Sequence, residues 1–330
     1  MSLKKTLLLF SGLVATSPAL AVCEVDTLPP LGGAAPTTLN IPSFTIKIDA
    51  DTPVDTALPI TGLDSNQDSL VSFHNCEVGE AYGKSVTALL TASPTQHLFN
   101  THVEGIAVKP RWNNGAAFGH FPSISAMTAT RFNYPATSFF RLEFYKTKQR
   151  LNLQNPQGDL LLPAGIVAYN WVTSDNIINS GQKLHVGNIH IISTPVCRLD
   201  GEKTVDFKTV STKDINNSVT RPLNFSLRCT TDYGTYSASA ALSTLTPTSD
   251  NNFIKVRDNS GNIDTLKIRV NDSKGQALPV DMSRADIKTA IKSDTSAEFA
   301  WSATLLRAST TAMPEIGPFT ASAEIVLQVN

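Results

Sequence analysis

Apolar and polar residues alternate with a period of two in several short segments of the chain, which is the pattern of half-buried β-strands. Segments with this pattern, or with dense runs of apolar residues, are 44–48, 139–145, 184–192, 223–227 and 266–270. Turn signals separate them at 114–115, 258–261 and 273–275. Apolar stripes of helical period are rare. Only residues 283–292, with Ser283 as a cap, are expected to form one or two helical turns.

Short strands at regular spacing predict an all-β fold built from antiparallel β-sandwiches. The chain has 330 residues, which corresponds to two domains at roughly 100–200 residues each. Hydrophobic residues make up 41% of it, enough for packed cores, so wholesale disorder is excluded. Its 27 basic and 28 acidic side chains leave a formal charge of -1. Without a basic excess to hold a phosphate backbone, nucleic acid is not an expected partner.

Residues 1–21 have the features of a secretory signal peptide. Lys4 and Lys5 supply the positive charge, residues 6–15 are apolar, and Ala19-Leu20-Ala21 fits the cleavage rule, so the mature chain is expected to begin at Val22. The apolar run is too short to span a bilayer, which needs about 20 residues, and no later segment reaches that length. We therefore expect an exported protein without a membrane span.

Four cysteines remain in the mature chain and permit three pairings. An oxidising compartment and the spacing along the chain favour Cys23–Cys76 and Cys197–Cys229. A metal site made of all four thiolates lacks the close C-x-x-C spacing that such sites use. One disulfide in each half also indicates two domains.

The predicted boundary lies at Ser193-Thr194-Pro195, after an apolar strand and directly before Cys197. This predicts a first domain over 22–192, a linker over 193–196 and a second domain over 197–330.

The second half resembles the pilin domain of chaperone–usher fimbriae. The resemblance rests on Cys197 near its start, on Cys229 after the alternating segment 223–228, and on the terminal segment 317–330. In that family the last strand ends at the C-terminus and turns alternate apolar residues toward the core. The residues that do so here are Phe319, Ala321, Ala323, Ile325, Leu327 and Val329.

This resemblance implies an incomplete immunoglobulin-like sandwich that lacks one strand and leaves an apolar groove open. An open edge of this kind is an aggregation hazard. In the family the groove is filled by strand addition, first from a periplasmic chaperone and then from the N-terminal extension of the next pilus subunit, with an outer-membrane usher as the assembly site. The six alternating residues of the terminal segment are therefore the expected subunit and chaperone interface.

The whole mature chain resembles the two-domain fimbrial tip adhesins, of which the type 1 fimbrial mannose-binding adhesin is the familiar example. In the first half the likeness rests on Cys23, on Cys76, and on the segments 140–146 and 162–168. A complete domain before the pilin half implies a subunit that accepts a strand and cannot donate one. Such a subunit sits at the tip of the fibre, where its lectin-like first domain would bind a receptor.

Two polar and aromatic loops of the first half are candidate receptor sites. Sugar binding needs an apolar ring for stacking and amide side chains that both donate and accept hydrogen bonds. The first loop offers Trp112, Asn113, Asn114, Phe118 and His120, and the second offers Arg131, Asn133 and Tyr134. The alternative is that Trp112 belongs to the core and that Asn114-Gly115 is only a hairpin turn.

Six histidines also lie in the first half, and three imidazoles can hold Zn²⁺. They are His74, His97, His102, His120, His185 and His190. No pair has the spacing that makes a zinc site recognisable, so scattered loop histidines are the favoured interpretation and no cofactor is expected. No nucleophile elbow, zinc-protease motif or phosphate loop is present either, so the chain is not expected to be an enzyme.

The sequence thus favours a fimbrial tip adhesin, exported through the periplasm to the cell surface, that binds a glycan or protein receptor. Two alternatives stay open at this point. One is a structural tip or adaptor subunit without a ligand, and the other is a metal-dependent binding protein that uses the histidines.

Overall fold

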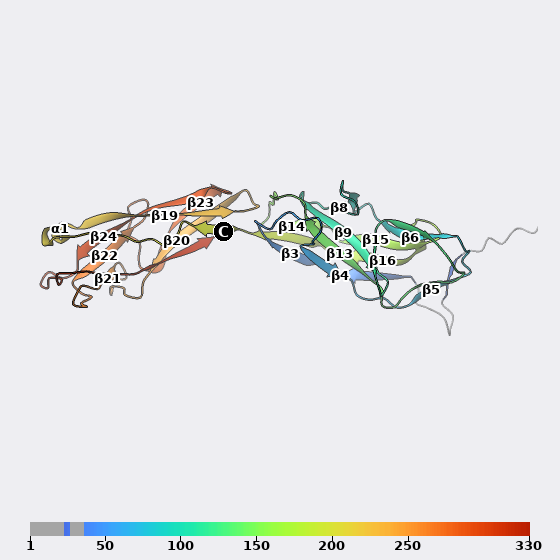
Figure 1. Ribbon diagram of the computed structural model, residues 1–330, viewed down its shortest axis with the longest axis horizontal. Coiled ribbons are helices and arrows are strands. Elements are labelled where there is room, and N and C mark those ends of the chain that lie inside the picture. The colour runs from blue at the N-terminus through green and yellow to red at the C-terminus, as the bar shows by residue number, and fades with distance from the viewer. Residues whose placement is uncertain (1–22, 27–35) are drawn as a thin grey trace, which may run out of the picture.

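The computed structural model describes residues 23–26 and 36–330, and it shows an all-β protein made of two β-sandwich domains placed end to end (Figure 1). Within the described residues, no strand of the first group, 24–194, pairs with a strand of the second group, 196–329. The predicted signal peptide lies outside the described residues. In the part of the chain that the structure describes, no helix is long and apolar enough to cross a membrane.

The N-terminal domain packs two larger sheets face to face and adds two smaller ones. Its sheet orders are β4-β13-β9-β8-β7 with β10 on β9, β11-β6-β15-β16-β2, β1-β5-β12 and β14-β17-β3. The strands are β1 Glu24–Val25, β2 Thr37–Ile41, β3 Phe44–Asp49, β4 Thr61–Asp64, β5 Val71–His74, β6 Ala81–Val86, β7 Thr91–Ala92, β8 Phe99–Asn100, β9 Ile106–Asn113, β10 Phe118–His120, β11 Ser123–Ala126, β12 Phe132–Tyr134, β13 Phe139–Lys146, β14 Asp159–Leu162, β15 Gly165–Val172, β16 Ser180–Val186 and β17 Ile189–Thr194.

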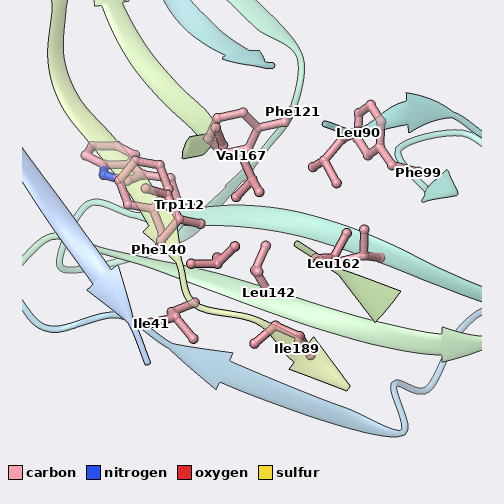
Figure 2. Packing of buried hydrophobic residues seen from close by; sticks show 14 of the residues in the cluster. Ile41, Leu90, Phe99, Trp112, Phe121, Phe140, Leu142, Leu162, Val167 and Ile189 are labelled. Carbon is pink, nitrogen blue, oxygen red and sulfur yellow. The ribbon is translucent and has the colours of Figure 1, made fainter. Parts of the chain in front are cut away.

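Alternation along the strands builds the core of this domain. On β13 the side chains of Phe140, Leu142 and Phe144 are fully buried between the two large sheets. Figure 2 shows Phe140 and Leu142 in this cluster together with Trp112, which comes from the neighbouring strand β9.

The C-terminal domain has one sheet of five strands and one of three. Their orders are β18-β19-β24-β22-β21 and β23-β20-β25. The strands are β18 Val196–Leu199, β19 Val219–Thr230, β20 Thr235–Ser243, β21 Ile254–Val256, β22 Leu266–Asn271, β23 Asp281–Lys292, β24 Ser296–Arg307 and β25 Glu324–Val329. Phe225, Phe299 and Trp301 form the aromatic centre of its core, with ring centroids 4.8 to 6.3 Å apart.

Helix is confined to two short segments of the described chain, the 3-10 turn η1 Ile177–Asn179 and the helix α1 Thr212–Asn217. Ser211 caps α1, its hydroxyl accepting from the backbone N–H of Asp214. The predicted helix over 283–292 is wrong, because this segment lies within β23. Pairing with β20 buries Asp286 there, and bulges near Met282 and Ala290 break the alternation that would have signalled a strand.

The disulfides Cys23–Cys76 and Cys197–Cys229 are both formed, as predicted. The first joins the residue directly before β1 to the segment after β5, and the second joins β18 to β19. The connection between the domains is shorter than the predicted linker 193–196. Ser193 and Thr194 belong to β17 and Val196 belongs to β18, so that Pro195 alone stands between the two strands.

Candidate functional site

The terminal strand β25 is hydrogen-bonded along one edge only. It pairs with β20 from Ala238↔Val329 to Ser243↔Glu324, and no described strand pairs with its other edge. Ile325, Leu327 and Val329 point toward the core but are only half-buried. The domain thus carries a row of unpaired backbone groups beside incompletely covered apolar side chains, which is the arrangement that invites an added strand.

Beside this edge lies a cleft of about 1180 Å³. One wall is the segment 201–210, which belongs to no strand, and the other is the segment 313–323 before β25. The floor is apolar and comes from both sheets, including Leu223, Phe225, Leu242, Ile254, Leu266 and Ile268. The cleft therefore opens directly onto the hydrophobic core of the domain.

Four of the six predicted interface residues line this cleft: Phe319, Ala321, Ala323 and Ile325. Leu327 and Val329 continue along β25 toward the N-terminal domain. The expectation of one unbroken strand from Phe319 is wrong, because the strand begins only at Glu324 and both Ala321 and Ala323 are exposed. The chain crosses between the sheets here, and Thr320 exchanges two backbone hydrogen bonds of 2.9 Å with Arg257 instead of pairing with β20.

A buried aspartate holds the second wall in place. The carboxylate of Asp258 accepts hydrogen bonds from the backbone N–H of Glu315 at 3.2 Å, from that of Asn262 at 2.9 Å and from the Thr265 hydroxyl at 3.1 Å. Burial by itself would raise the pKa of Asp258, but these hydrogen bonds outweigh it and lower the pKa to about 2. The Asn259 amide also donates to the Ile316 carbonyl at 3.2 Å. Sequence reasoning identified 258–261 only as a turn.

In the N-terminal domain, the predicted receptor loop is the turn of the β9–β10 hairpin. The side-chain oxygen of Asn113 accepts from Gly115 N–H at 2.7 Å, and that of Asn114 accepts from Ala116 and Ala117 at 3.0 and 2.9 Å. Gly115 has φ +93°, which favours glycine. The acceptor atoms of both amides are therefore engaged in shaping the turn.

Trp112 and Tyr134 are not surface residues, which corrects their assignment as ligand contacts. Trp112 is 9% exposed and donates from Nε1 to Gln182 at 2.7 Å, while Tyr134 is 2% exposed and its ring lies edge-on to the indole. Burial raises the pKa of the Tyr134 hydroxyl, which donates to the Trp171 carbonyl. Alternation along β9 turns Trp112 inward and leaves its neighbours Arg111 and Asn113 outside.

Phe118 and His120 lie on the outer face of the same sheet. The Phe118 ring is half-buried, with the guanidinium groups of Arg111 and Arg141 each 4.8 Å from its centre. His120 is exposed and stacks on His97 at 4.8 Å. Partial burial, followed by the nearby positive charges, lowers the pKa of His120. This pairing joins the last residue of β10 to the turn between β7 and β8, and the sequence alone carried no signal for it.

The histidines do not form a metal centre in the described part of the chain, where no group of three or more His, Cys, Asp or Glu side chains is placed to hold an ion. His74 lies 3.7 Å from Glu24, and His102, His185 and His190 are not brought together with the stacked pair.

Arg131 and Asn133 are exposed at the second loop. Arg131 forms an ion pair with Asp26 at 3.0 Å. Phe132, between Arg131 and Asn133 in the sequence, packs against Tyr82 with ring centroids 4.5 Å apart.

We call this end of the domain, with the loops 75–80, 114–117, 127–131 and 173–179, the distal end. The strands β9 and β15 end there and β6 begins there, opposite to Thr194 and the C-terminal domain.

Residues 187–330 match the family described as fimbrial protein. The resemblance of the second half to pilus subunits is thereby confirmed. Proteins of this family are structural components of fimbriae, in agreement with the prediction that the chain is not an enzyme. No curated protein sequence matches the chain.

Several solved structures are similar to the chain at low sequence identity. The chaperone–tip adhesin complex CsuC–CsuE of Acinetobacter baumannii is 11% identical, with 90% of this chain and 100% of that chain covered and a TM-score of 0.43. The CupB6 tip adhesin of Pseudomonas aeruginosa is 12% identical over 93% of each chain, with a TM-score of 0.35. The receptor-binding domain of the adhesin MrkD1P of Klebsiella pneumoniae is 17% identical over 49% of this chain and 97% of its own, with a TM-score of 0.38.

Proposed function

We propose that the protein is the tip adhesin of a chaperone–usher fimbria. The observation that carries this proposal is the cleft over the core of the C-terminal domain, beside the unpaired edge of β25. A strand inserted there would hydrogen-bond to the free edge and cover the apolar floor with alternate side chains. The donors would be a periplasmic pilus chaperone during export and then the next pilus subunit, with an outer-membrane usher between the two steps.

The position at the tip follows from what precedes the C-terminal domain. A subunit inside the fibre needs a free segment in front of its pilin domain to fill the cleft of its neighbour. In this chain the segment before β18 is the strand β17, which is paired with β3 and β14 inside the N-terminal domain. The subunit can therefore accept a strand in its cleft, but the segment before its pilin domain cannot serve as a donor strand.

The N-terminal domain is then the receptor-binding module. It has its own disulfide and its own core, and its distal end is the end that points away from the C-terminal domain (Figure 1). Exposed side chains at this end include Arg131 on a loop, Asn133 on the adjoining short strand β12, and Ile178 in the turn η1. We assign the contact with a glycan or surface protein to these loops, because binding residues on β scaffolds are typically carried by loops.

Site-specific photo-crosslinking tests the assembly half of the proposal. A photoreactive residue at Ala321, which is exposed and lines the cleft, is expected to capture two partners in fimbriated cells. Mass spectrometry should identify them as a periplasmic chaperone and the N-terminal extension of another pilus subunit. The same residue at Ile124, 73% exposed on the N-terminal domain, is the matched control and should capture neither. Equal capture from both positions would contradict the assignment.

The receptor half is tested by binding of the mature chain to arrays of glycans and of extracellular matrix proteins. Binding of the protein to a positive probe should weaken when Arg131 or Asn133 is changed to alanine. It should be unaffected by Asn152→Ala, an exposed position at the opposite end of the domain, beside Leu151. Binding to no probe, and to no cell type presented, would instead favour a structural tip subunit without a ligand.

A further inference from the structure

The loop between β19 and β20 reaches out of the C-terminal domain into the base of the N-terminal domain. Asp232 lies at its centre and is 1% exposed. Its carboxylate accepts from the backbone N–H of Leu151 at 3.0 Å and from the Ser193 hydroxyl at 2.7 Å. Its backbone carbonyl accepts from the N–H of Leu153, also at 3.0 Å. One residue of the second domain thus satisfies three donors of the first.

Tyr233, the next residue of this loop, makes both a polar and an apolar contact with the N-terminal domain. Its hydroxyl accepts from the backbone N–H of Ser193 at 3.1 Å, and its ring packs against the hydrophobic core cluster of that domain. The loop therefore covers one end of the hydrophobic core of the N-terminal domain, in addition to its polar contacts with that domain.

Charged side chains extend the same contact. Arg150 of the N-terminal domain pairs with Asp294 at 3.0 Å, and the hydroxyl of Thr230 donates to the same carboxylate at 2.6 Å. Lys146 is 1% exposed and donates to the Ala50 carbonyl at 3.3 Å. Burial lowers the pKa of Lys146, while the negative charge of Asp232 acts in the opposite direction and favours the charged amine. A buried carboxylate and a buried amine thus come from opposite sides of the junction.

The covalent connection leaves little freedom for the domains to swing. Pro195 is the only residue between β17 and β18, and its ring fixes its own φ angle. Thr194 at the end of β17 is held in turn, because its carbonyl accepts from the N–H of Ala50 at 2.9 Å. A flexible tether would have used several residues that belong to no strand.

We propose that residues 231–234 form an interdomain latch that locks the two domains into one rigid unit, with Asp232 as the residue that positions them. Opening the junction would leave the carboxylate of Asp232 and three backbone N–H groups without their partners and would uncover the core beneath Tyr233. Each of these hydrogen bonds contributes a modest net free energy even though water would replace it on opening, and exposure of the apolar surface beneath Tyr233 costs more, so the closed arrangement is favoured. The receptor-binding loops at the distal end are thereby held at a fixed angle to the cleft. This inference rests on the contacts at the junction and does not depend on the proposed function.

Hydrogen exchange of the mature chain, residues 22–330, tests the latch. In the wild type, the amides of Leu151, Leu153 and Ser193 should exchange slowly, as sheet amides do. Asp232→Ala should speed exchange at these three amides by at least ten-fold, leave the core amides of β13 and β24 unchanged, and increase the radius of gyration in solution scattering. Asp232→Asn keeps a side-chain acceptor, so its exchange rates at these three amides should lie between those of the wild type and of Asp232→Ala. Asp250→Ala, an exposed aspartate of the same domain, is the matched control and should change nothing.

Two results would overturn the latch. One is rapid exchange of Leu151, Leu153 and Ser193 in the wild type, which means that the junction is open in solution. The other is an Asp232→Ala variant with unchanged exchange and unchanged radius of gyration. Should that variant fail to fold, Tyr233→Phe removes only the hydroxyl that accepts from Ser193. It should then speed exchange at Ser193 alone, and unchanged exchange there would count against the proposal equally.

Discussion

Removal of residues 324–330 is expected to abolish accumulation of the folded protein, with at least a ten-fold loss in the periplasm. The deletion takes away β25, which pairs with β20 over six residue pairs and carries Ile325, Leu327 and Val329 over the core. The domain already has one open edge, and the deletion would uncover β20 as well and widen the cleft. A domain with only about 5–15 kcal/mol of stability has no reserve for such a loss.

An immunoblot of the periplasmic fraction measures this effect. Glu324→Ala and Gln328→Ala change exposed side chains of the same strand and should accumulate as the wild type does. A truncated chain that accumulates normally and melts cooperatively in its C-terminal domain would mean that β25 is not part of the core.

Trp112→Ala is expected to lower the free energy of unfolding of the N-terminal domain by about 3–5 kcal/mol, the usual cost of removing a large aromatic side chain from a core. The indole packs against Tyr134, and its Nε1–H donates to Gln182, which is 0% exposed. The substitution leaves both a cavity and a buried acceptor with one donor fewer.

Urea denaturation followed by a probe in the N-terminal domain measures this change. Ile124→Ala, at an exposed position, is the matched control and should lie within about 0.5 kcal/mol of the wild type. Receptor binding by Trp112→Ala should fall only as far as the domain unfolds. Loss of binding with unchanged stability would show instead that the indole is a ligand contact.

The sequence was sufficient to predict the fold class and both disulfides. Alternation along a strand is a local property, and an oxidising compartment together with the spacing of the cysteines favours one pairing. The predicted helix over 283–292 failed because bulges in β23 interrupt the period of two, and pairing with β20 decides the conformation there.

Two of the residues predicted to contact a receptor are buried instead, for a different physical reason. Tryptophan and tyrosine are equally suited to stack on a sugar and to fill a core. Which of the two they do depends on whether the side chain lies on the inner or the outer face of its sheet. Trp112 and Tyr134 point inward. The stacking of His97 on His120 and the reach of Asp232 into the N-terminal domain depend on tertiary contacts between distant segments, which no local pattern records.

Thermal unfolding of the mature chain with and without a complementary strand tests most directly whether the C-terminal domain is incomplete. The strand is a peptide of alternating apolar residues, either fused after Asn330 through a flexible linker or added in trans. Filling the cleft should raise the Tm of the C-terminal domain by at least about 10 °C, because 1 kcal/mol corresponds to roughly 4–8 °C in a domain of about 100 residues. The same peptide with aspartate at its apolar positions should have no effect. An equal Tm in all three samples would mean that the domain is complete without a partner, and would contradict the account.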